Sequence, residues 1–516
     1  MSMQGALRPP FFCLMRLQDS LNRLKEFDKE LCILRDALAV LEFDQETAMP
    51  EENVDERSRQ QAALSAVIQK KATDGALRSV VDSIDEQELS SAADRALVRR
   101  HKRFLRTEGC LDEDFVAEEK KLTCVASAFW QKARAENDFS LFAPYLEKII
   151  SHLRTKAGLI DSSADCYDTL LSLYEEDSDV DKVSAVFDEL EPFIHDLIVK
   201  TGGKTADTSF LCVPYDKQKL HSYCLDLIGK MGFDFKRGAV SLSAHPFTSF
   251  LGTDDIRITT RYSDPGWFDP VATIVHECGH ALYDMNAALN PEIRGTSLGY
   301  GSSMSLHESM SRFWENMILR SRAFWLGQYP EICKVIPDMQ SVPLDSFLKA
   351  VNKAEPSAIR VNADELTYPM HIILRFRLEK TLISGQLSVN ELPSKWNELS
   401  EQLIGYEVRN DSEGCLQDSH WAGGLFGYFP SYAMGSIAAA SFYAALEESA
   451  GGPDVLEAEI AAGNFGLISS FLNDRIWRFG SVYTFEETVR RVTGRQLDIS
   501  GYKVYLERKY SSLYNL

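Results

Sequence analysis

The segment VATIVHECGHALYDMN, residues 271–286, contains the string His276-Glu277-Cys278-Gly279-His280 and determines how the rest of the chain is interpreted. Asp269 suits a helix N-cap and Pro270 the first helical position, so we expect the segment to be a helix. Residues one turn apart share one face of a helix. A polar face is therefore predicted at Thr273, His276, Glu277, His280 and Asp284, opposite an apolar face at Val271, Ile274, Val275, Cys278, Ala281, Leu282 and Met285.

The polar face carries groups that can bind a metal ion and activate water. Two imidazoles at positions i and i+4 can bind one zinc ion, and the carboxylate of Glu277 is placed to take a proton from a water molecule beside it. This combination is typical of zinc peptidases. The alternative is an amphipathic helix with two partly buried histidines, because a His-Glu-x-x-His string also arises by chance. The rest of the sequence has to decide between these two interpretations.

Composition excludes several classes of function. The chain has 516 residues, of which 45% are hydrophobic and 25% charged, so it can bury a large core. Its formal net charge of −21 disfavours binding to nucleic acid or to an anionic membrane. The sequence contains no run of about 18 apolar residues that would cross a membrane. We therefore expect neither nucleic acid nor membrane among its partners.

The cysteines and the N-terminus indicate a cytoplasmic protein. The ten cysteines occur singly, without a C-x-x-C pair or a disulfide framework, as expected for reduced thiols. The N-terminal FFCLM is too short, and too soon followed by charged residues, for a secretory signal. We expect residues 1–15 to form a tail before the first helix.

Periodicity predicts one mostly α-helical domain over residues 16–516. Helical spacing of apolar residues runs through 16–237, most clearly in 17–41, 54–72, 90–108, 113–135, 144–158 and 181–200. Residues 238–262 instead alternate and are rich in β-branched side chains, which predicts two or three short strands beside the metal helix. Catalytic helices are expected over 269–516, interrupted by a glycine-rich segment at 414–436.

A catalytic zinc site needs a third protein ligand. Glu308 and Glu315 lie on the same side of a predicted helix, about 10 Å apart, so one ion can be bound by only one of them. Glu308 is the predicted ligand, and Glu315 is left as a supporting or structural acid. Without the upstream motif, a solvated acid on a helix face would be the better interpretation of either residue.

Peptide hydrolysis also needs hydrogen-bond donors aimed at the developing oxyanion. The glycine-rich segment supplies His420, Tyr428 and Tyr432. From the local sequence alone, the two tyrosines are more readily interpreted as residues of the wall than as catalysts.

Six short sequence blocks occur in a fixed order along the chain. They are HPF at 245–247, DIRITT at 255–260, HECGH at 276–280, HESMS at 307–311, IRVNADE at 359–365 and GCLQDSHW at 414–421. Together they resemble the motif series of the thermostable carboxypeptidase Taq family of metallopeptidases. The resemblance extends from the DQET block at 44–47 to the VTG block at 492–494 and the YLERKY block at 505–510.

The resemblance implies a fold and an activity. The fold is expected to be mostly α, similar to the neurolysin and angiotensin-converting-enzyme type of zinc peptidase, with a deep groove and a homodimeric state. The activity is expected to be metal-dependent removal of single residues from peptides with a free C-terminus, with broad side-chain specificity. One Zn²⁺ per chain is implied, with Co²⁺ or Mn²⁺ as possible substitutes.

The resemblance also implies roles for individual residues. His276, His280 and Glu308 become metal ligands and Glu277 the general base, while His420 and Tyr432 stabilise the oxyanion, with Tyr428 as the rival tyrosine. His245 and Arg360 become candidates for binding the terminal carboxylate of the substrate, for which a guanidinium is well suited.

Three further residues keep an open interpretation. Asp255 and Arg257 are expected on a strand at the edge of the groove, where backbone groups can pair with an extended peptide and side chains can brace the site. For Arg360 the alternative is an i,i+4 ion pair with Asp364.

The chain departs from the family pattern at two places. Phe43 stands where Trp is expected, and residues 476–480 read IWRFG where relatives tend to show Ile-His-x-His-Gly.

Two other functions remain open at this point. The first is a zinc endo-oligopeptidase with the same ligands but without an effective carboxylate site. The second is a catalytically silent, helical peptide-binding protein that keeps the pattern. An intact Glu277 between two histidines argues against the second.

Overall fold

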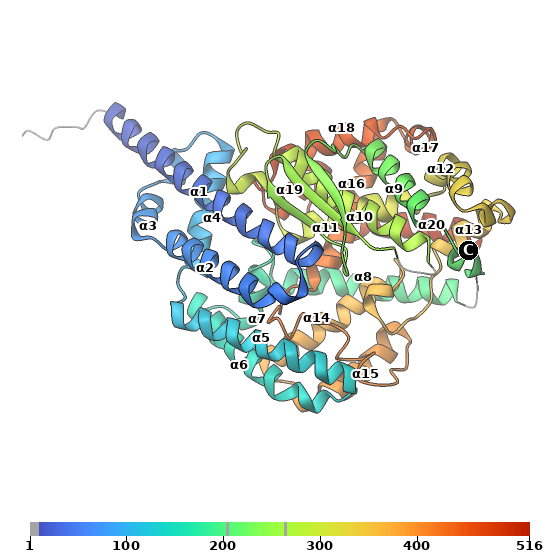
Figure 1. Cartoon of the computed structure of the whole chain (residues 1–516), viewed down its shortest axis with the longest axis horizontal. Coiled ribbons are helices and arrows are strands. Elements are labelled where there is room, and N and C mark those ends of the chain that lie inside the picture. The colour runs from blue at the N-terminus through green and yellow to red at the C-terminus, as the bar shows by residue number, and fades with distance from the viewer. Residues whose placement is uncertain (1–9, 203–205, 263–265) are drawn as a thin grey trace, which may run out of the picture.

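A computed structural model describes residues 10–202, 206–262 and 266–516, with side chains from residue 17 onward (Figure 1). Helices build nearly the whole molecule, and one small sheet lies among them, which confirms the predicted mostly α fold. The α-helices are α1 (Pro10–Thr47), α2 (Val54–Ala72), α3 (Gly75–Asp82), α4 (Ala92–Thr107), α5 (Glu113–Glu136), α6 (Ala143–Ile160), α7 (Cys166–Ser172), α8 (Val180–Thr201), α9 (Lys217–Met231), α10 (Phe268–Ala287), α11 (Met304–Arg312), α12 (Arg322–Val335), α13 (Leu344–Val351), α14 (Tyr368–Ser384), α15 (Leu392–Leu399), α16 (Pro430–Ala450), α17 (Pro453–Ala461), α18 (Gly466–Arg475), α19 (Phe485–Thr493) and α20 (Ser500–Tyr514).

The N-terminal part differs in detail from the sequence prediction. Helix α1 begins at Pro10 and not near residue 17, and it ends at Thr47, six residues beyond the predicted end. Residues 1–9 of the predicted tail, and the side chain of Cys13, lie outside the described residues. The other nine cysteines are free thiols. None of the described helices combines the length and the apolar composition needed to cross a membrane.

The sheet consists of β1 (Gly238–Leu242), β2 (Thr248–Gly252) and β3 (Asp255–Thr260) in the order β1-β3-β2. Strand β3 pairs parallel with β1 and antiparallel with β2. The DIRITT block is therefore the central strand of the sheet, so the expectation that its backbone groups pair with an extended peptide is wrong. Its backbone groups are already paired on both sides, so an added peptide strand could pair only with β1 or β2.

Helix α10 packs its predicted apolar face into the core. Val271, Ile274, Cys278 and Ala281 are fully buried. The helix begins at Phe268 with Trp267 at the N-cap position, so the prediction of Asp269 as N-cap is wrong. Trp267 is fully buried and donates its indole N–H to the Phe210 carbonyl at 3.0 Å, which anchors the start of the helix in the core.

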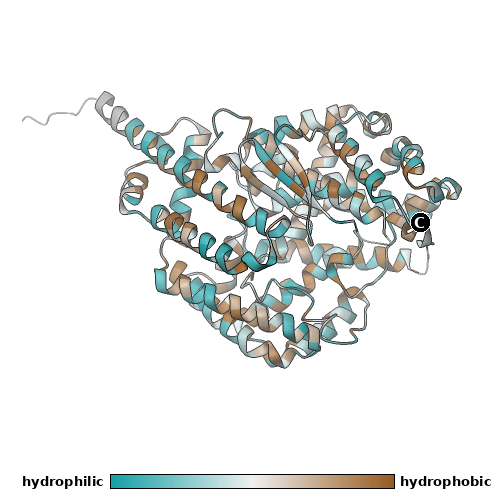
Figure 2. Ribbon diagram, in the orientation of Figure 1, coloured by the Kyte–Doolittle hydropathy of each residue, from teal (hydrophilic) through white to brown (hydrophobic). Residues whose placement is uncertain are grey.

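The hydrophobic residues form two clusters. The larger cluster runs from α5 to the C-terminal helix and encloses α10 and α11. The smaller cluster joins α1 to α4 and includes Ile293, Leu298 and Val482 from the remainder of the chain. Hydrophobic and hydrophilic residues alternate along α1 and α2 in Figure 2, as expected for helices with one buried face.

The segment that departs from the family pattern at 476–480 packs behind the helices of the metal motif. Trp477 is buried and its indole N–H lies 3.2 Å from the Met310 sulfur on α11. The Gly480 carbonyl accepts a hydrogen bond of 2.7 Å from the Tyr283 hydroxyl on α10. The segment thus supports the orientation of both helices.

Glycine residues allow α11 to lie unusually close to two neighbouring helices. A Cβ at Gly279 of α10 would come within 2.7 Å of the Met310 carbonyl oxygen and the Ser311 Cα, both backbone atoms of α11. A Cβ at Gly435 of α16 would lie 2.9 Å from the Glu308 Cβ. Real Cβ atoms do not approach other atoms so closely, so these contacts require glycine.

Gly279→Ala is therefore expected to separate α10 from α11. Overpacking of this kind costs about 1–3 kcal/mol of unfolding free energy. Thermal unfolding should show a lowered Tm, and equilibrium dialysis should show weakened metal binding. Gly158→Ala is the matched control, because a Cβ at that position of α6 meets no atom within 4 Å and alanine is the better helix former. Equal Tm values for the two variants would contradict the requirement for glycine.

Candidate metal and peptide site

Three side chains from α10 and α11 bring possible metal-binding atoms together. One ligand atom each from His276, His280 and Glu308 lies within 4.8 Å of the other two. The Glu308 Oε2 is 3.8 Å from the His276 Nε2 and 3.6 Å from the His280 Nε2. The helical spacing i, i+4 places both imidazoles on one face of α10, and the close packing at Gly279 brings α11 against that face.

The other nitrogen of His276 is held by Glu315. Its Nδ1 lies 3.0 Å from the Glu315 Oε2. Glu315 belongs to a π-helix, Phe313–Leu319, that continues α11, and its carboxylate also accepts N–H groups from Arg312 at 3.3 Å and Arg320 at 3.0 Å. With Nδ1 engaged in this way, Nε2 of His276 remains available for a metal ion.

His280 is held by a relay that sequence reasoning missed. Its Nδ1 lies 2.7 Å from the His307 Nδ1, and the His307 Nε2 lies 3.2 Å from the Asp284 Oδ1. Asp284 in turn accepts the Gly301 backbone N–H at 2.9 Å. Two sequence signals could have suggested this relay: Asp284 lies one turn after His280, and His307 directly precedes Glu308.

The charges of the cluster suit a cation. Burial alone would raise the pKa of Glu308, but Arg312 and the two histidines of α10 hold it far below its usual value. The Arg312 Nε donates to the Glu308 Oε1 at 2.6 Å, which leaves Oε2 facing the imidazoles. Two imidazole nitrogens and a carboxylate oxygen are the donor set of many catalytic zinc sites, so the residues present fit a divalent metal.

Glu277 is fixed by the sheet. The Thr248 hydroxyl on β2 lies 2.7 Å from the Glu277 Oε2 and 3.0 Å from the Glu277 backbone oxygen. Glu277 itself is buried. Thr248 was not predicted, and its position one residue after the HPF block was the available signal.

Arg360 lies in a buried charge cluster. Its Nε and Nη2 donate to the Asp418 Oδ1 at 3.0 and 2.8 Å, and its Nη1 donates to the Tyr368 hydroxyl at 3.1 Å. Arg375 from α14 donates to the other oxygen of Asp418, with its Nε at 2.7 Å. Two guanidinium groups thus share one carboxylate.

The predicted alternative for Arg360, an ion pair with Asp364, is wrong. Residues 360–362 form a 3₁₀ turn, so positions 360 and 364 do not face each other as they would on an α-helix. Asp364 instead accepts the backbone N–H groups of Leu366 and Thr367 at 2.9 and 3.0 Å and the Thr367 hydroxyl at 2.8 Å.

The glycine-rich segment brings His420 to both predicted tyrosines. The His420 Nε2 lies 3.3 Å from the Tyr432 hydroxyl, and the His420 and Tyr428 ring centroids are 5.5 Å apart. The guanidinium of Arg360 lies over the Tyr432 ring at 5.1 Å. Burial lowers the pKa of His420 to about 4, so its imidazole is neutral at physiological pH. A neutral imidazole can present one N–H donor.

The remaining predicted residues lie outside the ligand cluster. His245 is exposed in the loop between β1 and β2, and its carbonyl accepts the Ser243 hydroxyl at 2.6 Å. Asp255 and Arg257 pair with each other through two hydrogen bonds of 2.7 Å. The Arg257 guanidinium lies 5.2 Å from the Phe43 ring centroid, and Phe43 in turn packs on Phe247. The Asp255–Arg257 pair therefore connects α1 to the loop that carries the HPF block.

A buried carboxylate that was not predicted holds the segment bearing His420. Glu379 on α14 is fully buried and accepts the Trp421 indole N–H at 2.7 Å, the Gly427 backbone N–H at 2.9 Å and the Tyr167 hydroxyl at 2.8 Å. Burial, partly offset by these donors, raises the pKa of Glu379 to about 7. Glu379 thus joins two positions on either side of the 422–426 turn.

Comparison with known proteins gives a consistent result. The chain matches the model of the carboxypeptidase Taq (M32) metallopeptidase family over residues 23–510. The chain belongs to this family. The resemblance seen in the sequence is therefore confirmed, and with it a metal-dependent carboxypeptidase that hydrolyses peptides.

Individual relatives cover almost the whole chain. Carboxypeptidase 1 of Bacillus subtilis is 34% identical over 494 residues, which is 95% of this chain and 97% of that protein. Thermostable carboxypeptidase 1 of Thermus thermophilus is 34% identical over 509 residues, 96% of this chain and 98% of that protein. The crystal structure of an M32 carboxypeptidase from Deinococcus radiodurans superposes with a TM-score of 0.93 at 32% identity, covering 96% of this chain and 100% of that one.

In this M32 enzyme, Glu315→Gln is expected to weaken metal binding about 10- to 100-fold, because the carboxylate that orients His276 loses its charge. Competition with a fluorescent chelator measures the affinity. Glu331→Gln is the control, since Glu331 pairs with Lys334 on the exposed surface of α12. An unchanged affinity in Glu315→Gln would contradict the orienting role.

Glu379→Gln is expected to lower kcat about tenfold or more, with KM within about twofold and metal content unchanged. An amide has one acceptor oxygen for three donors and turns its own N–H groups toward some of them, so His420 and Tyr428 lose their positions. Glu365→Gln is the control for a loss of stability, because it removes another buried carboxylate, the partner of Lys509. Equal kcat values in both variants would show that Glu379 is structural only.

Proposed function

We propose that the chain is a zinc-dependent carboxypeptidase that removes single residues from the free C-terminus of peptides. The observation that carries this proposal is the combination, in one site, of a metal-ligand cluster, a carboxylate beside it and a buried arginine pair with a surplus positive charge. His276, His280 and Glu308 would hold one metal ion per chain.

The bound metal ion would polarise the carbonyl of the cleaved bond and lower the pKa of a water molecule. Glu277 acts as general base toward that water and returns the proton to the leaving amine. The hydrogen bond from Thr248 holds the carboxylate of Glu277 in one orientation, which avoids reorganisation during the reaction.

His420 and Tyr432 stabilise the oxyanion in this proposal. The neutral imidazole of His420 and the hydroxyl of Tyr432 are donors that lie 3.3 Å apart. Tyr428 remains the rival tyrosine, because its ring lies 5.2 Å from the Tyr432 ring and 5.5 Å from the His420 ring.

Arg360 binds the terminal carboxylate of the substrate. A guanidinium has five N–H donors, and the side-chain bonds to Asp418 and Tyr368 use three of them. One carboxylate between Arg360 and Arg375 leaves a net positive charge in a buried place. A second carboxylate, from the peptide terminus, would neutralise this charge.

The proposal also includes roles for His245, Asp255 and Arg257 and the identity of the metal. His245 is a second group for the terminal carboxylate, while Asp255 and Arg257 brace the loop that carries it. Two imidazoles and a carboxylate favour zinc, and Co²⁺ or Mn²⁺ are possible substitutes. The single domain over 16–516, the homodimer and the cytoplasmic location stay predictions, the homodimer from the family resemblance alone.

The alternatives considered from the sequence receive no support from the comparisons. Neither an endo-oligopeptidase nor a catalytically silent peptide-binding protein is found among the relatives described above. No observation favours a second function.

The proposal predicts that cleavage requires both a metal ion and a free carboxylate. Mass spectrometry should detect loss of the C-terminal residue from a free peptide, little cleavage of the same peptide amidated at its C-terminus, and no cleavage after treatment with a chelator. Added Zn²⁺ should restore activity. Equal cleavage of the free and the amidated peptide would contradict the carboxypeptidase mechanism, although the protein would still be a metallopeptidase.

Arg360→Gln provides a matched test of the carboxylate site. The variant should lose the preference for the free peptide, mainly through a higher KM, because the charged fork is absent. Arg322→Gln removes an arginine paired with Asp345 at the surface and should keep the preference.

A further inference from the structure

A cavity of about 620 Å³ lies between the N-terminal helices and the catalytic body. Residues of α1 and α4 line it on one side, and residues that precede or begin α11 line it on the other. None of Arg360, Asp418, His420 and Tyr432 is among its lining residues. The cavity is therefore separate from the position proposed for the terminal carboxylate of the substrate.

The cavity begins close to the metal ligands. Ser303 and Met304 line it, and Glu308 follows Met304 after one turn of α11, about 6 Å along the helix axis. Phe250 lines it from β2, the strand that holds Glu277 through Thr248. Tyr174 also lines it and packs edge-on against Tyr428 at 5.2 Å.

Three arginines of the cavity, Arg35, Arg100 and Arg103, form what we call the arginine cluster. Within the part of the chain that the structure describes, none of the three has a carboxylate within ion-pair distance. Arg100 donates to the Ser481 hydroxyl at 3.3 Å, and Arg103 donates to the Ser172 carbonyl. The Arg100 side chain is exposed, and those of Arg35 and Arg103 are half-buried, so all three can be reached by a ligand in the cavity.

The carboxylates that line the same cavity mostly have other partners. Asp28 accepts bonds from His101 and from the Ser297 backbone N–H, and Asp36 accepts the Tyr300 hydroxyl at 2.7 Å. Glu176 pairs with Arg99 at 3.6 Å. Glu108 is exposed at the end of α4. The cavity therefore holds equal numbers of both charges, but the cations of the arginine cluster are left with unused donors.

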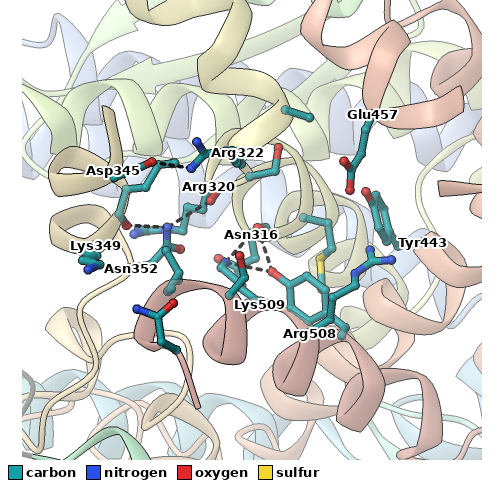
Figure 3. A pocket seen from close by; sticks show the side chains of 18 residues that line it. Asn316, Arg320, Arg322, Asp345, Lys349, Asn352, Tyr443, Glu457, Arg508 and Lys509 are labelled. Carbon is teal, nitrogen blue, oxygen red and sulfur yellow. Dashed lines mark hydrogen bonds and ion pairs between the residues drawn. The ribbon is translucent and has the colours of Figure 1, made fainter. Parts of the chain in front are cut away.

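Another cavity, which lies beside the π-helix that carries Glu315, provides a comparison. Figure 3 shows this cavity, of about 350 Å³, with cationic side chains around it. Here most cations are paired, since Arg320 binds Glu315, Arg322 binds Asp345, Arg508 binds Glu447 and Lys509 binds Glu365. These four cations all have carboxylate partners, whereas the arginine cluster, which is half-buried at Arg35 and Arg103 and exposed at Arg100, has none among the described residues.

We propose that the arginine cluster binds an acidic side chain of the peptide substrate, upstream of the residue that is removed. Guanidinium groups with unused donors bind carboxylates through charge-assisted hydrogen bonds. An extended peptide advances about 3.3–3.6 Å per residue, so the acidic residue is expected about two or more positions before the cleaved bond. The inference rests on the proposed function and specifies its substrates as acidic peptides.

A free anion such as inorganic phosphate could use the same chemistry. The peptide is favoured because Ser303 and Met304 line the cavity about one helical turn before the metal ligand Glu308. The net charge of −21 would otherwise repel acidic peptides, and a local cationic cluster lets the enzyme accept them.

The test compares peptides that differ at a single position, where one peptide has a side-chain carboxylate and the other has an amide. A neutral, Gln-containing octapeptide with a free C-terminus is the reference, and Glu replaces Gln at each upstream position in turn. Both kcat/KM and the Kd of a fluorescent-labelled peptide are measured for the holoenzyme. The wild type is expected to favour Glu over Gln by about tenfold in at least one position.

Arg35→Gln and Arg100→Gln should each reduce this preference to less than about threefold, and the double variant should abolish it. Arg322→Gln, an arginine of the other cavity, should retain the full preference. Inorganic phosphate should compete with the Glu peptide more strongly than with the Gln peptide. Equal kcat/KM and Kd values for Glu and Gln peptides in the wild type would overturn the proposal, as would a preference that survives in the double variant.

Phosphate could also bind to the arginine cluster although the enzyme shows no preference for Glu peptides. That result would overturn the assignment to substrate and would leave the cluster as an anion site. If no peptide is hydrolysed, the proposed function fails. The Kd comparison then still decides whether the arginine cluster recognises an acidic side chain, so the two failures are distinguishable.

Discussion

The close packing of α10 against α11 is the constraint on which the site depends. Histidines one turn apart are present on α10 in any case, but they meet Glu308 only because Gly279 lets the backbones approach. Gly435 on α16 supports α11 from its other side, against the Glu308 Cβ. The position of Glu308, the third ligand, therefore depends on glycine at both positions, because the densely packed interior has no room for a side chain there.

Around this contact, each functional group is held by a second side chain, in most cases from another element. Glu315 holds His276, the His307–Asp284 pair holds His280, Arg312 holds Glu308, and Thr248 holds Glu277. The same arrangement recurs at the glycine-rich segment, where α14 supplies both Arg375 to Asp418 and Glu379 to Trp421 and Gly427. Such supporting partners reduce reorganisation when substrate charge develops in a buried site.

Charge is distributed unevenly in this acidic molecule. Buried cations are generally paired, as in the cavity behind Glu315, because an unpaired charge in the interior is costly. Arg360 and Arg375 differ because the two buried guanidinium groups share one carboxylate. The arginine cluster between α1 and α4 is more exposed and has no carboxylate partner in the part of the chain that the structure describes, and in our proposal a peptide substrate supplies the negative charge at both places.

The sequence by itself determined the mostly helical fold, the place of the sheet, the family and the set of residues that could form the site. It could do so because helical periodicity, the spacing of His276 and His280 and the series of motif blocks are local patterns. It could not determine which strand of the sheet is central, that Arg360 pairs with Asp418 in place of Asp364, or that His307, Thr248 and Glu379 hold the site. These features depend on contacts between residues tens to hundreds of positions apart, and only the tertiary structure decides them, because packing selects a partner by its position in space and not by its distance along the chain.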